Sequence, residues 1–580
     1  MSVRLAKTAG FCMGVKRAVD MVLDMPVPQG KVHFYTYGPL IHNPQTVELL
    51  EKRGFQPIRT IEEIQEPREG ATLILRAHGI SPEERRRIKE SGLKIVDATC
   101  PKVGHVQAII KKHASRDYDI LLIGDPHHPE VNGLLGFAGE RGIVVQSEEE
   151  VASLPDLRKV CVVAQTTQSL DTFHRIVRRV QDRFPETLVF DTICNSTEER
   201  QREIQTMAAE VDAFFIVGGR NSANTLRLAA LASQTGTPTF HIETADELAG
   251  IDLARYDRIG VSAGASTPNW IIDRVVESLR KEQDRRKGLL RSLFQGWILL
   301  VKTDVFSSLG AGILTLACLL LQGRPPELLP VWTAALYVYA MHTLNRVLDT
   351  RTSSILGTFR EASYRRHRRL YGQLGFASMV LALVGALLAG TSSFLFLLTL
   401  SVFGMLYNVR IWPNRWRFET FRDIPGSKNV SMATAWAAVT AILPTLRDGL
   451  SLEPGWIVSF LFVFALVVVR SALSDLQDLQ SDRLLGRETI PVVIGQEMTQ
   501  KLLNSFSFLL ILLLVAAAAA GWVTPFAWLL VSCPFYLWIC FRLCDRRSGL
   551  SGVVLEGLLE TGYFIAGLAA LLWLGIGRSV

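Results

Sequence analysis

Three cysteines in the first half of the sequence occupy similar local settings. Cys12, Cys100 and Cys194 each follow a strand-like run and precede a segment with helical periodicity. At the start of a helix, the unpaired N–H groups and the helix dipole favour a thiolate. Ligands of α/β proteins also bind at the carboxyl ends of the strands. The three cysteines are therefore candidates for metal ligation.

Polar residues recur at two similar intervals after each cysteine, again at the ends of strand-like runs. They are His42 and His78 after Cys12, His128 and Thr166 after Cys100, and Ser222 with Asn224, then Ser266, after Cys194. Such a recurrence predicts three pseudo-equivalent α/β units. Each unit would offer one thiolate and two polar strand ends to a shared centre.

Three converging thiolates favour a [4Fe–4S] cluster in which one iron lacks a cysteine ligand, because soft sulfur ligands select such clusters. That iron would be open to a substrate. Zinc is the competing interpretation, but structural zinc ligands usually occur in close C-x-x-C pairs, which these cysteines do not form. Cys161, inside the apolar run VCVVA, is predicted to be a small buried hydrophobic residue instead.

Histidine, serine and asparagine at strand ends could bind a diphosphate, because they supply directional hydrogen bonds. Glu130 follows His128 by two residues in HHPEVNG. Its carboxyl group could protonate an iron-bound hydroxyl so that the hydroxyl leaves as water. Taken in isolation, Glu130 would be interpreted as a surface charge, and a lone histidine such as His241 as structural.

The composition of the 580-residue chain changes midway. Charged residues are frequent up to about Arg286, whereas long uncharged stretches dominate from Trp297 onward, which predicts a soluble half and a membrane half. Because residues 1–20 lack the apolar core of a signal peptide, we expect the soluble half in the cytoplasm. The net charge of +7 indicates contact with membrane lipid rather than with nucleic acid.

The second half contains apolar stretches that predict an all-α polytopic domain of about nine transmembrane helices. The predicted boundaries are a soluble domain at 1–280, a basic linker at 281–293 and a membrane domain at 294–580. Basic loops face the cytoplasm, so the first helix should start inside and the carboxyl terminus of an inner or cytoplasmic membrane protein should lie outside.

Three acids in the second half lie at helical spacing. Asp475, Asp478 and Asp482 would share one helical face if the helix continues through them. Their mutual repulsion would be relieved by Mg²⁺ bridging to a substrate diphosphate. As charges on a loop outside the membrane, they would need no such explanation.

An ordered series of motifs in residues 1–280 resembles the LytB/IspH family of 4-hydroxy-3-methylbut-2-enyl diphosphate reductases. The motifs are GFCMGVKRAV, GPLIHNPQTVELL, LRAHGISP, VDATCPKV, HPEVNG, AQTTQS, DTICNST and SAGAS. The sequence departs from the family pattern at Ala223, where relatives often carry serine, and at Asp125, where histidine is common.

The resemblance implies a role for each candidate residue of the soluble half. The cluster ligands would be Cys12, Cys100 and Cys194, and the catalytic residues would be Glu130 with Thr166. The diphosphate contacts would be His42, His78, His128, Ser222, Asn224 and Ser266. The implied reaction yields isopentenyl and dimethylallyl diphosphates, with an external ferredoxin or flavodoxin as electron donor.

Residues Asp475 to Gly495 resemble the second aspartate motif of the UbiA superfamily of intramembrane prenyltransferases. The family's first motif matches at Asn345 and Asp349, whereas Arg346 and Ser353 replace two acids. The Mg²⁺ ligands implied by the resemblance are Asn345, Asp349, Asp475, Asp478 and Asp482, and the implied diphosphate-binding cations are Arg410 and Lys428.

The resemblance to prenyltransferases implies transfer of a prenyl group from its diphosphate to an acceptor. Two alternatives remain for the membrane half: a non-catalytic anchor, which the depleted first motif favours, and a transporter that uses the aspartates as an ion path. The motif from Asp475 to Gly495 argues against the transporter. The preferred hypothesis is a bifunctional isoprenoid enzyme.

Overall fold

The computed structural model describes most of the chain, in two compact units that cover residues 1–285 and 286–580. The described residues are 2–25, 33–64, 71–283, 289–348, 364, 366–407, 421, 424, 426–448, 453–485, 489–543 and 552–577. The two units are described separately below.

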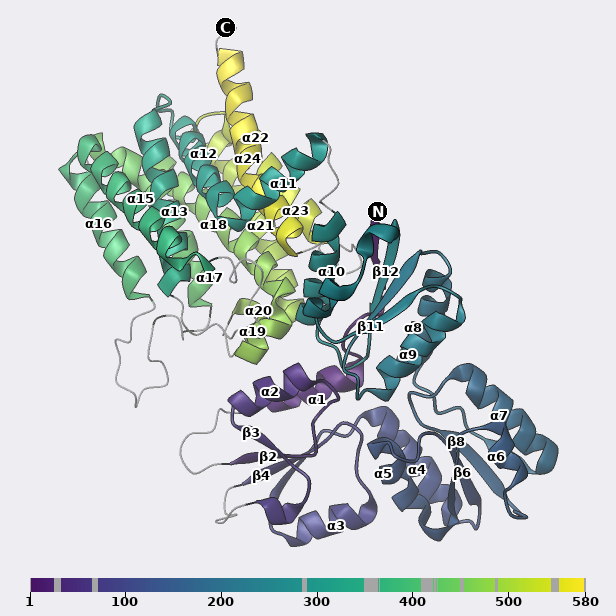
Figure 1. The fold of residues 1–580 in the computed structure, drawn as a ribbon. Helices are drawn as coiled ribbons and strands as arrows, with labels where there is room; N and C mark the ends of the chain where they lie inside the picture. Colours follow the sequence, from purple (N-terminus) through teal and green to yellow (C-terminus); the bar gives the residue numbers. More distant parts are fainter. Residues whose placement is uncertain are drawn as a thin grey trace. The chain divides into compact units, whose positions relative to one another are not determined.

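The first unit contains three four-stranded sheets in which all neighbouring strands are parallel, and each sheet with its helices forms a separate lobe in Figure 1. In spatial order the first sheet has β1 (Ser2–Leu5), β12 (Arg258–Ala263), β10 (Ala213–Val217) and β11 (Thr239–Ile242). The second has β3 (Phe55–Ile58), β2 (Phe34–Tyr37), β4 (Thr72–Leu75) and β5 (Lys94–Asp97). The third has β7 (Gly142–Val145), β6 (Asp119–Ile123), β8 (Val160–Ala164) and β9 (Thr187–Val189).

Helices and loops connect the successive strands, as parallel pairing requires. The α-helices are α1 (Met13–Leu23), α2 (Pro44–Lys52), α3 (Pro82–Glu90), α4 (Pro101–Ala114), α5 (Pro129–Ala138), α6 (Glu148–Ala152), α7 (Leu170–Arg183), α8 (Asn195–Ala208), α9 (Ala223–Gln234) and α10 (Asn269–Gln283). Short 3₁₀ turns are η1 (Ile61–Glu63), η2 (Gly139–Arg141), η3 (Ala245–Gly250) and η4 (Leu253–Arg255).

The fold class predicted for the soluble half is confirmed, and the three sheets share one topology. In each sheet the first strand of the repeat lies between the second and the third, and a fourth strand follows the third. The fourth position is taken by β5, β9 and β1, so β1 closes a sheet whose other strands come from the far end of the unit. Each cysteine therefore follows the last strand of a sheet, not the first strand of a new one.

The central strands are largely apolar, and β8 and β10 are wholly so, as is usual for parallel sheets whose two faces are covered by helices. Successive residues of β6 alternate between two cores: Leu121 and Ile123 pack with α7, whereas Ile120 and Leu122 pack with α4 and α5. Cys161 on β8 belongs to the second of these cores and is fully buried, as the apolar run around it predicted.

The second unit is helical. Its α-helices are α11 (Leu289–Lys302), α12 (Val305–Leu321), α13 (Leu328–Leu348), α15 (Arg368–Ala389), α16 (Thr391–Leu406), α17 (Ser427–Ala437), α18 (Pro454–Gln477), α19 (Leu479–Leu485), α20 (Ile490–Ile494), α21 (Gln496–Ala519), α22 (Ala527–Leu530), α23 (Ser532–Leu543) and α24 (Gly552–Gly577). A π-helical turn, η6 (Ala438–Ile442), and a 3₁₀ turn, η7 (Leu443–Asp448), continue α17.

The number of membrane spans differs from the prediction. Within the described residues, five helices are long and apolar enough to cross a membrane, or six if the bent pair α11 and α12 counts as one span. Two shorter apolar helices, Thr391–Leu406 and Ala527–Arg542, do not reach that length. The second unit is thus a membrane domain, but nine spans are not confirmed.

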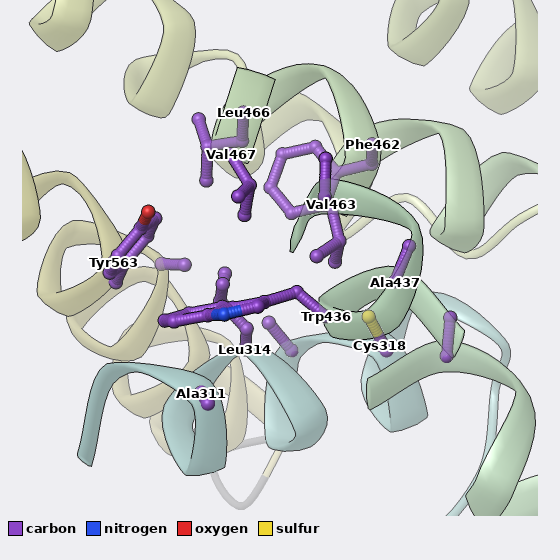
Figure 2. Packing of buried hydrophobic residues seen from close by; sticks show 14 of the residues in the cluster. Ala311, Leu314, Cys318, Trp436, Ala437, Phe462, Val463, Leu466, Val467 and Tyr563 are labelled. Carbon is purple, nitrogen blue, oxygen red and sulfur yellow. The ribbon is translucent and has the colours of Figure 1, made fainter. Parts of the chain in front are cut away.

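A single large hydrophobic core joins the helices of the second unit. Figure 2 shows the Trp436 indole of α17 among side chains of α12, α18 and α24, with Tyr563 on one side and Val463 on another. The Trp436 and Tyr563 rings lie 5.1 Å apart between centroids. Trp436 also donates a hydrogen bond from Nε1 to Nε2 of His342 on α13, at 3.3 Å. This core brings α12, α13, α17, α18 and α24 together around the polar residues discussed below.

Candidate functional sites

The three predicted cysteines of the first unit begin three helices. Cys12, Cys100 and Cys194 are the residues before α1, α4 and α8, and each has an extended backbone. The Sγ atom of Cys12 accepts a hydrogen bond from the N–H of Val15 at 3.4 Å. A cysteine at the start of a helix receives N–H donors and a favourable dipole, both of which stabilise the thiolate needed for metal ligation.

Backbone hydrogen bonds place the cysteines against the polar strand ends of the same sheets. The N–H of Cys12 donates to Ala265 O at 3.1 Å, that of Cys100 to Ala77 O at 2.9 Å and that of Cys194 to Thr166 O at 2.9 Å. Ala265 precedes Ser266 and Ala77 precedes His78. Each sheet therefore brings one cysteine beside the loop that carries its second polar group.

The cysteines fit a shared metal cluster on two observations. Burial raises the pKa of the Cys100 thiol, the N–H groups of Lys102 and Val103 lower it, and the nearby Cys12 and Cys194 raise it again. A Cβ atom added to Gly14 would lie 2.5 Å from Sγ of Cys100 and 4.0 Å from Sγ of Cys12, so only glycine fits between these thiols. Three sulfur ligands from three sheets, with no close pair in sequence, suit an iron–sulfur cluster better than structural zinc.

The three predicted histidines form one cluster. The ring centroids of His42, His78 and His128 lie 4.5, 5.5 and 5.4 Å apart, and one ligand atom from each lies within 4.8 Å of the others. Burial lowers the pKa of each ring, to about 4 for His128. The rings are therefore neutral at pH 7, and each offers one donor and one acceptor.

Three buried polar atoms of the predicted diphosphate contacts have no partner among the described residues. They are Nε2 of His42, Nδ1 of His78 and Nδ2 of Asn224. Buried polar atoms are almost always hydrogen-bonded in native proteins, so a group of unsatisfied atoms indicates a binding site for a polar ligand. His128 accepts the N–H of Glu130 on Nδ1 at 3.2 Å, which leaves the proton of its neutral ring on Nε2.

The histidines should make the stability of the first unit depend on pH. A ring with a lowered folded-state pKa binds fewer protons than in the unfolded chain, so stability is present above pH 6.5 and is lost as the pH falls toward 4. For His128 the loss is about 3 kcal/mol. Urea unfolding of His128→Gln should show a correspondingly shallower decline between pH 6.5 and 4 than the unmodified chain. Equal slopes would contradict neutral burial of this ring.

The remaining predicted diphosphate contacts lie on two loops of the first sheet. Ser222 begins α9 and accepts the N–H of Thr225 at 3.4 Å, and the buried Asn224 lies in the first turn of α9. Ser266 donates from Oγ to the carbonyl of His42 at 3.0 Å, which joins the loop after β12 to the histidine loop after β2. The structure thus clusters the three histidines and joins Ser266 to the loop of His42, and it places Ser222 and Asn224 at the start of α9.

Glu130 and Thr166 form a buried pair, although neither lies near the other in sequence. Thr166 donates its N–H to Oε1 of Glu130 at 2.7 Å and its hydroxyl to Oε2 at 3.0 Å. The side chain of Glu130 is buried, and burial raises the pKa of its carboxyl group against the lowering effect of Thr166 and Arg227. A buried carboxyl with a raised pKa is suited to hold a proton and release it to a neighbouring group.

Sequence reasoning missed two arginines of the first unit, of which Arg227 is half-buried and Arg200 is buried. Arg227, three residues after Asn224 on α9, donates to Thr167 O at 2.9 Å and to Gln165 Oε1 at 3.0 Å, which fixes the loop that holds Glu130. Arg200 on α8 donates to Ala263 O at 2.6 Å and to Gly10 O at 2.9 Å. The one sequence signal for Arg227 is its spacing: it follows Asn224 by three residues and therefore lies on the same face of the helix.

In the second unit, two predicted groups meet directly. Asp475 is fully buried, its Oδ1 accepts from Nζ of Lys428 at 2.6 Å, and its Oδ2 accepts from Nδ2 of Asn429 at 2.8 Å. Asp478 ends α18 and Asp482 lies in α19, so the helix breaks between Asp475 and Asp482. The N–H of Asp482 still donates to Asp478 O at 2.8 Å, which keeps these acids one turn apart.

The other predicted residues of the membrane half are less informative. Asn345 lies near the end of α13, while Asp349 and Arg410 lie outside the described residues. Arg346, which replaces an acid of the first motif, forms an ion pair with Asp304. Sequence reasoning did not single out Asp304.

Comparisons with known proteins divide the chain in the same way. Residues 3–280 match the family model described as LytB protein, and residues 311–554 match that of the UbiA prenyltransferase family. The 4-hydroxy-3-methylbut-2-enyl diphosphate reductase of Geobacter sulfurreducens is 42% identical over 288 residues, which cover 50% of this chain and 100% of the relative. The corresponding protein of Opitutus terrae is 41% identical over 290 residues, with 48% and 99% covered.

Solved structures also match each half. A structure of (E)-4-hydroxy-3-methyl-but-2-enyl diphosphate reductase is 40% identical and covers 48% of this chain and 100% of that protein, with a TM-score of 0.38. A UbiA homologue from Archaeoglobus fulgidus bound to DMAPP and Mg²⁺ is 16% identical and covers 47% and 98%, with a TM-score of 0.34.

Proposed function

The chain belongs to the LytB protein family through residues 3–280, and we propose that this unit reduces 4-hydroxy-3-methylbut-2-enyl diphosphate to isopentenyl and dimethylallyl diphosphates. The observation that carries the proposal is the meeting of three helix-capping cysteines with unsatisfied histidine and asparagine atoms in one group of loops. The reaction breaks the C–O bond of the hydroxyl group, consumes two electrons and two protons, and releases water.

The diphosphate of the substrate is bound by neutral donors. His42, His78 and His128 supply ring N–H groups, and the amide of Asn224 with the hydroxyls of Ser222 and Ser266 completes the site. Neutral donors bind an anion without a dedicated metal, and they cost less to bury than unpaired charges do. A [4Fe–4S] cluster on Cys12, Cys100 and Cys194, when bound, supplies the electrons singly, and a ferredoxin or flavodoxin is the external donor.

Glu130 delivers a proton to the leaving hydroxyl group. Thr166 holds both carboxylate oxygens in place, and burial favours the protonated form in the free enzyme. Arg227 braces the Thr166 loop from α9, the helix that also presents Asn224 to the diphosphate. One helix therefore connects the substrate's anionic end with the group that handles its proton.

The Glu130→Gln variant tests this role. Glutamine has nearly the same shape and can still meet Thr166, but it cannot supply the proton, so kcat should fall by about a hundredfold or more. The full chain, purified without oxygen and supplied with a chemical one-electron donor, is assayed for loss of substrate. The KM and the iron content of the Glu130→Gln variant should change little.

The exposed Glu140, in the turn after α5, provides a matched control. Glu140→Gln should retain the kcat of the unmodified chain within about twofold, because substitutions of exposed residues away from a site usually change stability very little. If Glu130→Gln retains kcat as well, proton delivery belongs to another group.

The membrane unit transfers a prenyl group from its diphosphate to an acceptor. Its segment 311–554 matches the UbiA prenyltransferase family. The allylic C–O bond breaks, diphosphate leaves with the electron pair, and the acceptor forms the new bond and loses a proton. Asp475, Asp478 and Asp482 would hold Mg²⁺, and this ion together with Lys428 would stabilise the departing diphosphate. Asn345 and Asp349 are proposed as further contacts of Mg²⁺, and Arg410 as a further contact of the diphosphate.

A non-catalytic membrane anchor is the second candidate, because Arg346 replaces an acid of the first motif. In both cases the reductase unit lies in the cytoplasm, residues 281–293 form the linker, and the carboxyl terminus lies outside. The linker includes residues 284–288, which are outside the described part of the chain.

A further inference from the structure

Asp304 is a fully buried acid at a break between two helices of the membrane unit. It lies between α11 and α12, whose axes differ by 79°. Its φ of 60° places it in the left-handed region, which a residue other than glycine rarely adopts. An acid buried in an apolar domain is costly unless it is paired, and such residues are functional candidates by default. The fold thus uses an unfavourable backbone conformation to place this carboxylate inside.

Three side chains converge on Asp304. Arg346 binds it with two nitrogens, Nε to Oδ2 at 2.9 Å and Nη2 to Oδ1 at 3.2 Å. Tyr364 donates its hydroxyl to Oδ2 at 2.7 Å, and Nδ1 of His342 lies 3.8 Å from Oδ1. A guanidinium has five N–H donors in a fixed plane, and within the part of the chain that the structure describes two of them bond to Asp304, so the other three can meet another anion. The Arg346 side chain is 34% exposed, so it is accessible to a ligand.

Arg346 lies at the same end of the membrane unit as the Lys428–Asp475 pair. Gln322 ends α12, and a Cβ atom added to Gly455 at the start of α18 would lie 3.7 Å from Cα of Gln322, so the end of α12 lies beside the start of α18. Asp304, at the start of α12, and Asp475, near the end of α18, therefore lie at the opposite end of these two helices. At that opposite end, His342 on α13 lies close enough to Arg346, on the same helix, and to Arg470, on α18, to interact electrostatically with both. Arg346 follows His342 by one turn, and Asp475 follows Arg470.

This end of the unit therefore presents two cations that are each held by a buried aspartate. Asp475 holds Lys428 and Asp304 holds Arg346, and both aspartates are 1% exposed. Paired cations attract a dianionic group, and a planar guanidinium can bind phosphate oxygens in a bidentate manner.

We infer that Arg346, fixed by Asp304, binds the diphosphate of the membrane unit's substrate and supplies a positive charge where the depleted first motif would otherwise use a metal ion. The inference rests on the proposed prenyl transfer. Among the described residues, Arg346 pairs with Asp304 and lies over the ring of Tyr364, and a guanidinium in this place does not fit a metal ion. The cation is thus built into the chain.

Two paired substitutions separate ligand binding from ion pairing. In Asp304→Asn with Arg346→Met, neither charge remains, and no unpaired buried carboxylate is left behind. In Asp304→Arg with Arg346→Asp, the ion pair is restored with its charges exchanged between α12 and α13. The matched control is Arg447→Met, which removes an exposed arginine that pairs with Glu327 at the opposite end of α13.

Binding of geranyl diphosphate with Mg²⁺ is measured by calorimetry on the full chain in lipid nanodiscs, and melting temperature checks the fold. Any binding to the first unit is common to all variants and cancels in the comparison. We expect both paired variants to bind about ten- to a hundredfold more weakly, as loss of a charge-assisted contact implies, and Arg447→Met to bind within about twofold.

The charge-exchanged pair decides the matter. If it restores both the melting temperature and the affinity, the pair is only structural and the inference is overturned. Should the paired variants fail to fold, Arg346→Lys keeps a cation beside Asp304 but not the planar fork, and unchanged affinity there would overturn the inference too. If the unmodified chain binds no geranyl diphosphate, the proposed prenyl transfer is contradicted together with the inference. If the unmodified chain binds it and the variants bind equally well, only the role of Arg346 is contradicted.

Discussion

Replacing Cys100 by serine should remove the iron–sulfur cluster and the reductase activity of the first unit together. Serine keeps the size of the side chain and leaves α4 intact, but an oxygen ligand does not suit an iron that selects thiolates. Mutating a residue that only hydrogen-bonds a metal ligand typically lowers metal affinity or activity by about 10- to 100-fold. Loss of a ligand itself should therefore lower the reductase rate by more than about a hundredfold. Purified without oxygen, the unmodified full chain should be brown and contain about four irons per chain. The Cys100→Ser chain should be colourless and contain far less iron.

Cys161 supplies the control, since it is a free cysteine of the same unit that lies in the core beneath β8. Burial raises the pKa of its thiol to about 12, so it is no thiolate ligand at neutral pH. Cys161→Ala should lose some stability but keep the colour and the iron. An active, colourless Cys100→Ser chain would exclude the cluster at this position.

The repeat of the first unit was visible in the sequence because strand ends and polar residues recur along the chain. What the spacing did not reveal is how the strands pair. Parallel partners come from distant parts of the chain, and β1 joins β12 although more than two hundred residues separate them. A local pattern carries no information about such pairing. The result is that Cys12 shares a sheet with Ser222 and Ser266 instead of with His42.

The residues that support the predicted site were harder to find than those within it. Cysteines and histidines at strand ends stand out by residue type, whereas Arg227 is one of many arginines on amphipathic helices. Only the fold shows that Arg227 is half-buried and that its guanidinium meets Gln165 and Thr167. Supporting residues act through contacts between sheets, which spacing within one segment does not encode.

For the membrane unit, composition predicted helices but not their breaks. An expected continuous helix through Asp475, Asp478 and Asp482 is interrupted at Asp478. Hydropathy also treats α11 and α12 as a single apolar stretch, although Asp304 separates them with a sharp bend. Both breaks carry acids, and both are places where a local preference yields to interactions between helices.

Replacing Asp478 by asparagine should abolish prenyl transfer and leave the reductase unchanged. Asp478 is the most informative of the three acids because Asp475 also holds Lys428 and Asn429, so its removal would disturb more than metal binding. Loss of one carboxylate from a Mg²⁺ site weakens both the metal and the diphosphate it bridges. We expect transfer from geranyl diphosphate to fall by about a hundredfold or more.

The assay uses the full chain in lipid nanodiscs with Mg²⁺, labelled geranyl diphosphate and several aromatic acceptors, and reductase turnover is measured on the same preparation. Reductase activity should stay within about twofold, because its diphosphate site uses histidine, amide and hydroxyl donors without Mg²⁺. Glu327→Gln, which changes a half-exposed acid before α13, should affect neither activity. If the unmodified chain shows no Mg²⁺-dependent binding or transfer and Asp478→Asn changes nothing, the membrane unit is an anchor, and its buried acids serve to hold Arg346 and Lys428 in a folded helical domain.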